Sequence, residues 1–296
     1  MRSLKSSVLL LGVCLISLSQ AEARPFRAMG TRTAITTGPQ HLEVGLRYQG
    51  FFGGDDLDSL GYHQLTPSAR FGIVKNLEVN LAFDVMLLTQ RGSPVVSPYA
   101  GDAPLGLQFT FIDTPKFALG VFGRLTIPVG AGNFEQLPIS LQDRIPPSLS
   151  DGTWDAEGTL VIEVRPTTSF RVMGNAGYLF HGTRQRPGAG AFDVPDAIRY
   201  DVAATLNLGD QWLIGVEMLG RSYFAAAVTP VWTDNAHQIE VLPSVRFEPI
   251  PNLVIEAAVG IGVTRGLGDI YRARALLGFT YEFDILGNKR VATERG

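Results

Sequence analysis

The sequence predicts an all-β protein, a closed antiparallel transmembrane β-barrel of about twelve strands. About twelve stretches of roughly ten to thirteen residues alternate apolar and polar side chains, and this period of two places the two kinds on opposite faces of a sheet. The connections between these stretches alternate short and long, and the pattern of an export signal precedes them. Short turns on one side, longer loops on the other and an even strand number are typical of bacterial outer-membrane barrels.

Residues 1–23 have the pattern of a cleaved signal peptide. Basic residues precede an apolar run over 8–18, which is too short to span a bilayer as a helix, and Ala21-Glu22-Ala23 forms an A-x-A cleavage site. A lipoprotein signal ending at Cys14 is the alternative, but the valine before that cysteine fits it poorly. Because Cys14 is the only cysteine, we expect a mature chain without disulfides or thiolate metal sites.

Composition excludes two classes of protein. The formal net charge is −3 and only 18% of residues are charged, which is not the basic balance of a nucleic-acid-binding protein, so no nucleic acid is expected as a partner. A membrane-spanning helix needs about eighteen or more apolar residues in succession. The longest apolar stretch after the signal, 253–263, is interrupted by Glu256, and its length suits a strand.

The predicted strands follow one another along residues 40–283, the expected barrel. Residues 24–39 are predicted to form an N-terminal periplasmic segment, and 284–296 a C-terminal polar tail. Proline, glycine and aspartate cluster in the connections, as turn residues do. The strands are expected at 40–52, 63–74, 77–88, 103–112, 117–129, 154–164, 169–180, 197–208, 212–224, 237–247, 253–264 and 271–283.

The stretch 77–88 has the clearest two-faced pattern. One face is wholly apolar and suits lipid, whereas the other is polar and suits a barrel interior. The outward set is Leu77, Val79, Leu81, Phe83, Val85 and Leu87, and the inward set contains Glu78, Asn80 and Asp84.

The last predicted strand, 271–283, places aromatic side chains at 279, 281 and 283 on its outward face. A final aromatic strand resembles the signal that the outer-membrane assembly machinery recognises, although a polar tail follows it here. We therefore expect outer-membrane lipids and this machinery as partners, and the bacterial outer membrane as the location.

The lengths of the connections set the expected orientation. Short turns follow the second, fourth, sixth, eighth and tenth predicted strands, and longer loops follow the odd ones. In outer-membrane barrels the short turns are periplasmic, so both termini are expected on the periplasmic side. A soluble sandwich would have no reason to separate loop lengths in this way, and a propeller would show a repeated motif that the sequence lacks.

The expected inward face carries many charges of both signs. Opposite charges on neighbouring strands lie close enough to pair, so one interpretation is a structural salt-bridge network that fills a narrow barrel. The other is a pathway that selects solutes by charge, although the near-balance of signs argues against strong selectivity. The lumen-lining candidates are Arg47, Arg70, Glu78, Asp84, Arg124, Glu163, Arg171, Arg199, Asp201, Glu217, Arg221, Glu240, Arg246, Glu256, Arg272 and Arg274, and further inward charges are Glu43, Asp155, Glu157, Arg165 and Glu282.

The strand number limits the lumen. Barrels of about eight strands are filled by side chains and those of about sixteen hold a water-filled channel, so about twelve strands predict a small pore or a lined tunnel. Long loops at 89–102, 130–152 and 181–196 would cap it or fold into it. The loop at 130–152 is unusually apolar, which fits either packing of this loop onto the barrel rim or a hydrophobic entrance for an apolar substrate.

Three segments carry a resemblance to a known family. They are Ala69 to Val79, with its Lys75-Asn76 turn, then Gly101 to Phe109, and Arg124 to Gly130. Together they resemble the outer-membrane channel proteins of phenol meta-pathway degradation. The resemblance extends over most of the chain after the signal and implies a barrel that transports small molecules, hydrophobic or aromatic ones among them. It carries over no binding residues.

Other functions stay open at this stage. A structural or adhesive barrel would place its function in the loops. An outer-membrane phospholipase would need a histidine two residues from a serine on a strand, and none of the four histidines, His41, His63, His181 and His237, has that pattern. An Asp/His protease is the other form of hydrolase, with His63 or His181 near outer strand ends and Asp55, Asp56 or Asp193 as the acid; isolated histidines at loop edges are usually solvated. We therefore expect no enzyme, no cofactor and no metal site; aspartates at 55, 56 and 58 offer at most a weak calcium loop.

Overall fold

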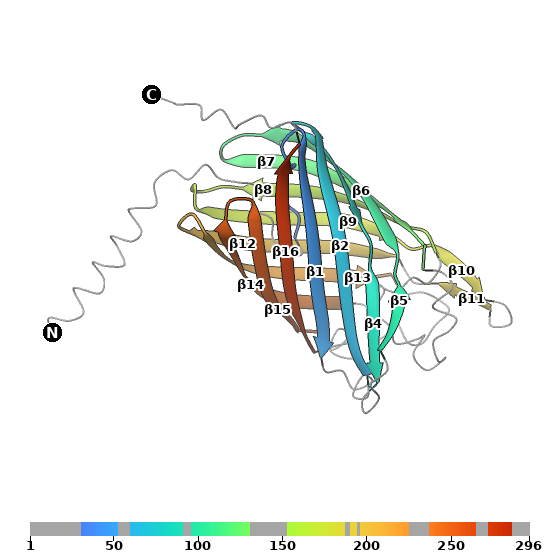
Figure 1. Cartoon of the computed structure of the whole chain (residues 1–296). Coiled ribbons are helices and arrows are strands. Elements are labelled where there is room, and N and C mark those ends of the chain that lie inside the picture. The colour runs from blue at the N-terminus through green and yellow to red at the C-terminus, as the bar shows by residue number, and fades with distance from the viewer. Residues whose placement is uncertain are drawn as a thin grey trace, which may run out of the picture.

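The computed structural model describes residues 31–52, 60–90, 96–130, 153–186, 190–193, 196–224, 237–264 and 272–285. These form one antiparallel barrel and a small hairpin beyond it (Figure 1). The strands are β1 His41–Phe52, β2 Leu60–Val74, β3 Leu77–Ala82, β4 Val85–Gln90, β5 Val96–Ala100, β6 Ala103–Asp113, β7 Phe117–Ile127, β8 Asp155–Val164, β9 Phe170–Phe180, β10 Thr183–Arg186, β11 Gly190–Asp193, β12 Ala197–Leu208, β13 Trp212–Tyr223, β14 His237–Ile250, β15 Leu253–Gly262 and β16 Ala273–Asp284.

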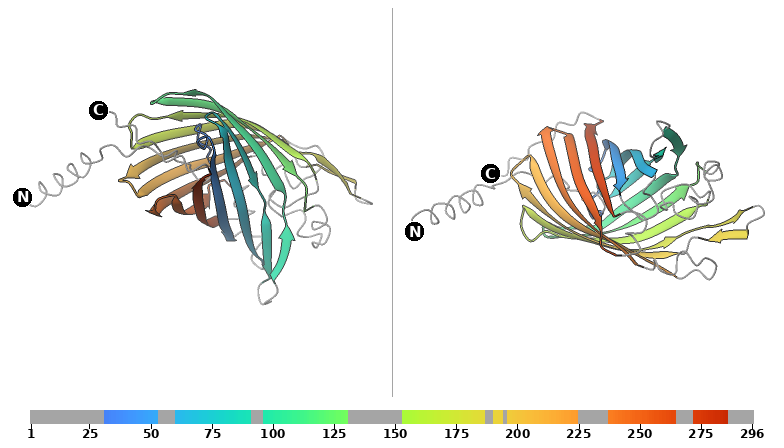
Figure 2. Two further views of the ribbon diagram at one scale, coloured as in Figure 1. Left: turned by 45° about the horizontal axis from the view of Figure 1, so that its top comes forward. Right: turned by 90° about the horizontal axis from the view of Figure 1, so that it is seen from below.

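The barrel closes because β1 pairs with both β16 and β2. The remaining strands pair with their neighbours along the chain, so the sheet returns to its starting strand; of the described barrel strands, β5 alone has a single partner, β4. In a bilayer this closure is what satisfies every backbone amide. The ring of strands is visible from two sides in Figure 2. The predicted closed antiparallel barrel of twelve strands is confirmed.

Two of the twelve strands are broken halfway. β3 and β4 are one strand interrupted at Phe83 and Asp84, and β5 and β6 are one strand interrupted at Gly101 and Asp102. The breaks lie side by side, since Gly101 N donates to Asp84 O at 2.7 Å. The single strand predicted over 77–88 is therefore divided.

Some connections predicted as loops are partly ordered strands. β5 lies in the predicted loop 89–102 because it continues the ladder of β4 beyond the break. The predicted loop 181–196 contains the hairpin of β10 and β11, which extends beyond one end of the barrel (Figure 1). Backbone groups in long connections need partners just as those of the barrel do, and these strands supply them. The apolar stretch 131–152 and residues 53–59 lie outside the described residues.

The two ends of the barrel differ in their connections. The turn end holds the short turns at 75–76, 114–116, 165–169, 209–211 and 251–252, and the loop end holds the longer connections. Both ends of the barrel sequence meet at the turn end, where His41 pairs with Asp284. The predicted separation of short turns from long loops is confirmed except at 91–95, where the strands β4 and β5 leave a connection no longer than the turn at 165–169.

The outer wall of the barrel is apolar. On β6, for example, Leu105, Leu107 and Phe109 are exposed, whereas the alternating Gln108 and Thr110 are buried in the interior. So broad an exposed apolar surface is unfavourable in water and suits lipid. No helix among the described residues is long and apolar enough to cross a membrane.

Candidate functional site

The N-terminal segment, residues 31–39, lies inside the barrel at its turn end. The Thr31 backbone N–H donates to Glu217 Oε2 on β13 at 2.7 Å. At the other end of the segment, the N–H and hydroxyl of Thr37 both donate to Glu78 Oε2 on β3 at 2.6 Å. Because β3 and β13 lie on opposite sides of the ring of strands, the segment crosses the lumen.

The middle of the segment packs against β6, β7 and β8. Thr33 donates its hydroxyl hydrogen to Glu163 on β8, and its carbonyl accepts from Gln108 Nε2 at 2.9 Å. Ala34 is fully buried against Ala118 and Phe122. The segment is thus held by polar contacts at both ends and by apolar packing between them.

A glycine on β2 lets the segment turn into the lumen. A Cβ at Gly72 would lie 2.1 Å from Gly38 O and 2.5 Å from Thr37 O, so only glycine allows this approach. Gln40 has a φ of 64°, the left-handed region that turns need. Its N–H donates to Gly72 O at 2.7 Å. These contacts fix the segment where it meets β1.

The segment expected to precede the barrel on the periplasmic side therefore does not stay outside it. Residues 31–37 lie in the interior instead, because the inward carboxylates of Glu78, Glu163 and Glu217 are fully buried and need donors. A buried carboxylate without partners is very costly, and the hydroxyls and backbone amides of a threonine-rich segment supply those partners. Sequence reasoning missed this role; the only signal was four threonines between 31 and 37.

Glu163 also carries the densest ion-pair network of this region. Its Oε1 accepts from Arg165 Nε at 2.9 Å and from Arg171 at 3.2 Å. Arg165 also forms a salt bridge with Asp113 on the exposed rim, with 3.1 Å between Nη1 and Oδ1. Arg171 itself is buried, so the ion pair with Glu163 stabilises its positive charge in the interior. This network ties the turn end of β6, β8 and β9 to the N-terminal segment.

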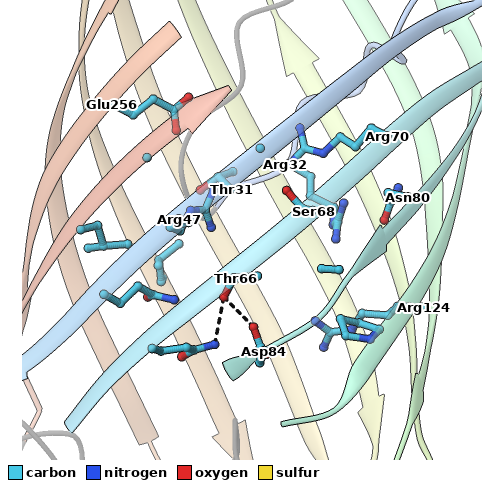
Figure 3. A pocket seen from close by; sticks show the side chains of 18 of the residues that line it. Thr31, Arg32, Arg47, Thr66, Ser68, Arg70, Asn80, Asp84, Arg124 and Glu256 are labelled. Carbon is cyan, nitrogen blue, oxygen red and sulfur yellow. Dashed lines mark hydrogen bonds between the residues drawn. The ribbon is translucent and has the colours of Figure 1, made fainter. Parts of the chain in front are cut away.

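A cavity of about 500 Å³ occupies the lumen beside the segment. All twelve barrel strands contribute to its lining, as do Thr31, Arg32 and Thr33. Figure 3 views this space, with Arg47 and Arg70 on one wall and Arg124 on another. Thr66 donates to Asp84 at 2.5 Å in the wall, beside the strand break. The lining is mainly polar and charged, which suits hydrated or ionic groups.

Two arginines that line this cavity pair with the buried Glu157, and two more act on its charge. Arg124 lies 2.7 Å and Arg199 lies 3.2 Å from its carboxylate. Arg32 and Arg221 also interact electrostatically with Glu157. We call these five residues the arginine cluster. It joins β7, β8, β12 and β13 with the N-terminal segment.

Three other arginines along the cavity each pair with one carboxylate. Arg274 holds Glu240 through two bonds of 2.7 and 2.6 Å, a bidentate geometry that is strong for this kind of pair. Arg70 lies 3.5 Å from Glu43, and Arg246 lies 3.9 Å from Glu256. These pairs fit the interpretation of a salt-bridge network in the wall.

The structure separates the predicted lumen candidates into three groups. Glu78, Glu163, Arg171 and Glu217 are buried at the turn end with the N-terminal segment. Arg272 is exposed at the loop end, just before β16. The cavity is lined by Arg47, Arg70, Asp84, Arg124, Arg199, Asp201, Arg221, Glu240, Arg246, Glu256 and Arg274. Arg32, from outside the predicted barrel, joins this last group.

The histidines have partners that their positions in the sequence do not reveal. His181 lies 3.2 Å from Asp155 and His63 lies 2.7 Å from the Tyr48 hydroxyl. Ser222 Oγ and His237 Nδ1 lie 2.9 Å apart near the loop end, because β13 and β14 place them in register. Within the described ranges, no acid pairs with His237. No group of three metal-ligating side chains occurs among the described residues.

Comparison with known proteins shows the fold. No family profile matches the chain, and no curated protein matches it by sequence. The chain resembles the COG4313 outer membrane channel from Pseudomonas putida F1, with a TM-score of 0.64 and 9% identity over 84% of this chain and 98% of that one. It also resembles the NanC porin, with a TM-score of 0.55 and 10% identity over 81% and 98% of the two chains. The KdgM porin gives a TM-score of 0.51 and 10% identity over 81% and 99%.

Proposed function

We propose that the chain is an outer-membrane channel for small molecules. The observation that carries this proposal is the polar cavity of about 500 Å³ inside a closed barrel with an apolar outer wall. Lipid on one side and a charged lumen on the other are the properties of a conducting barrel. The structural neighbours are porins and channels, which supports the same role.

The orientation follows from the two ends of the barrel. The turn end would face the periplasm, since short turns do so in bacterial outer-membrane barrels, and the loop end would face outward. The signal-like residues 1–23 support export, and the aromatic end of β16 supports recognition by the outer-membrane assembly machinery. Outer-membrane lipids would then surround the apolar wall.

The N-terminal segment would close this channel at the periplasmic end. It crosses from Glu217 to Glu78, and a solute on a straight path through the lumen would meet it. Passage then requires the segment to move or the solute to leave sideways through the wall. The resemblance to channels of phenol degradation supports small aromatic molecules as the solutes.

The experiment is single-channel conductance in planar bilayers. We expect the full chain to give a small conductance and a variant lacking residues 31–38 to give one several-fold larger, because the deletion opens the turn end. Heat-modifiable mobility on a gel, which reports a folded barrel, is the control for both proteins. The proposal would be contradicted if both proteins are folded, show no conductance and admit no small solutes into liposomes.

The lumen-crossing segment also favours a second candidate, a barrel with a structural role and no transport. In that case the segment would be a permanent part of the fold. The same deletion separates the two functions: a structural barrel would lose stability without gaining a pore, whereas the channel would gain conductance.

A further inference from the structure

The arginine cluster differs from the rest of the lumen in its balance of charge. Two guanidinium groups pair with Glu157 and two more act on its charge. Asp201 is the second carboxylate, 2.6 Å from Arg199 Nε. Asp155 acts on Arg124 as well, but it also contacts His181 at 3.2 Å. The four arginines therefore outnumber the three carboxylates here, whereas Arg70, Arg246 and Arg274 elsewhere along the cavity each have a carboxylate.

The strand register makes this excess more pronounced. Arg199 and Arg221 are directly opposite each other on β12 and β13, and like charges in that position are unfavourable. Among the described residues, Arg221 forms no salt bridge with a carboxylate; the Tyr223 side chain is its strongest partner, and the charges of Glu157 and Asp201 act on it as well. An anion between these two strands would remove the repulsion.

Hydrogen-bond donors in the cluster lack acceptors. Arg32 Nε and Arg124 Nε are buried, and neither has a hydrogen-bond partner among the described residues; one acceptor of the cluster, Glu157 Oε2, also lacks a hydrogen-bond donor, although Arg124 lies 2.7 Å from it. The Arg32 guanidinium lies 3.2 Å from the centre of the Phe122 ring, a cation–π contact that fixes it in place without using its donors. Buried donors of this kind normally find an acceptor.

Apolar side chains border the same place. Leu179 lies opposite Glu157 across β8 and β9, and Leu219 lies opposite Asp201 across β12 and β13. Both line the cavity. The arrangement therefore offers several guanidinium forks next to an apolar surface.

We propose that the arginine cluster binds the carboxylate of a small anionic solute, with an aromatic or aliphatic body against the adjacent leucines. The planar guanidinium matches a carboxylate through two parallel hydrogen bonds, and the unused donors of Arg32 and Arg124 supply further ones. This inference rests on the proposed channel function for the route by which the solute arrives, and it names the class of solute.

The test is calorimetric titration of the folded full chain in detergent with benzoate and with benzamide, its neutral analogue. We expect saturable binding of benzoate and binding of benzamide at least about tenfold weaker, since the charge-assisted bonds are lost. Arg221→Gln should weaken benzoate binding about tenfold, and Arg221→Lys, which keeps the charge but loses the fork, should weaken it less. Lys116→Gln removes one positive charge from an exposed turn and should leave the affinity unchanged.

Three results would overturn the inference. They are no saturable heat with benzoate, equal binding of benzamide, or unchanged affinity in an Arg221→Gln barrel that keeps its heat-modifiable mobility. Calorimetric titration detects binding whether or not the barrel conducts. It therefore tests the carboxylate site separately from the channel function. Benzoate binding by a chain that, with its deletion variant, neither conducts nor admits small solutes into liposomes would refute the channel alone. Conduction without benzoate binding would refute the carboxylate site alone.

Discussion

Strand β8 carries two glutamates on the same inward face, Glu157 and Glu163, and their surroundings differ. Glu163, near the turn end, accepts a hydrogen bond from Thr33 and pairs with Arg165 and Arg171. Among the described residues, Glu157, further along, accepts from one hydroxyl, that of Thr159, and otherwise pairs with arginines. One carboxylate holds the N-terminal segment, and the other pairs with arginines that line the cavity.

The difference shows how one residue pattern serves two purposes in a barrel. At the turn end the carboxylates are matched by hydroxyls, backbone amides and, at Glu163, arginines, so the interior there is filled. Around Glu157 the arginines exceed the carboxylates and a cavity remains. The charged side chains of this lumen therefore form a structural network at the turn end of the strands and line a cavity further along them.

The largest effect on stability is expected from removing Glu163, the anchor that holds the N-terminal segment through Thr33. Glu163→Ala should lower the free energy of unfolding by about 3–5 kcal/mol, because it leaves the buried Arg171 without its carboxylate. Unfolding in denaturant, followed by circular dichroism on the refolded barrel, measures this. The charge-matched control is Asp113→Asn, which touches the same network through Arg165 on the exposed rim and should cost about 1 kcal/mol or less. Equal losses in the two variants would contradict the assignment of Glu163 as an anchor.

A smaller effect, confined to the N-terminal segment, is expected from Gly72→Ala. The added methyl group would overlap Gly38 O and Thr37 O, and such overpacking costs about 1–3 kcal/mol. Because no charge changes, the segment should be displaced while the barrel wall stays intact, and conductance should rise. Gly158→Ala is the matched control, since nothing lies within 4 Å of its added Cβ. Unchanged conductance in a folded Gly72→Ala barrel would show that the segment does not occupy the path.

The barrel itself was predictable from the sequence because lipid and lumen impose opposite demands on alternate residues. The pattern of 77–88 gave both the inner and the outer face of β3 and β4 correctly. The break at Phe83 and Asp84 was not predictable, since it interrupts the backbone ladder and leaves the alternation of side chains unchanged. Strand β5 was missed because its ladder with β4 lies beyond that break.

The site was predictable only in part. The inward charges on strands follow from a period of two, so Arg124, Arg199 and Arg221 were identified. Which of them pair depends on the register between strands distant in sequence, which alternation does not determine. Arg32 belongs to no strand, and its place in the lumen depends on the buried carboxylates and on the room that Gly72 leaves.

The most direct test of the central claim is a cross-link between the N-terminal segment and the wall. Ala34 and Ala118 are both fully buried in one cluster, so Ala34→Cys with Ala118→Cys should cross-link efficiently with a short thiol reagent in the folded protein. Ala34→Cys with Ala197→Cys should not, because Ala197 belongs to a different cluster. The account predicts a cross-linked barrel whose conductance stays as small as that of the full chain. Equal cross-linking of both pairs, or a cross-linked barrel that conducts like the variant lacking residues 31–38, would contradict it.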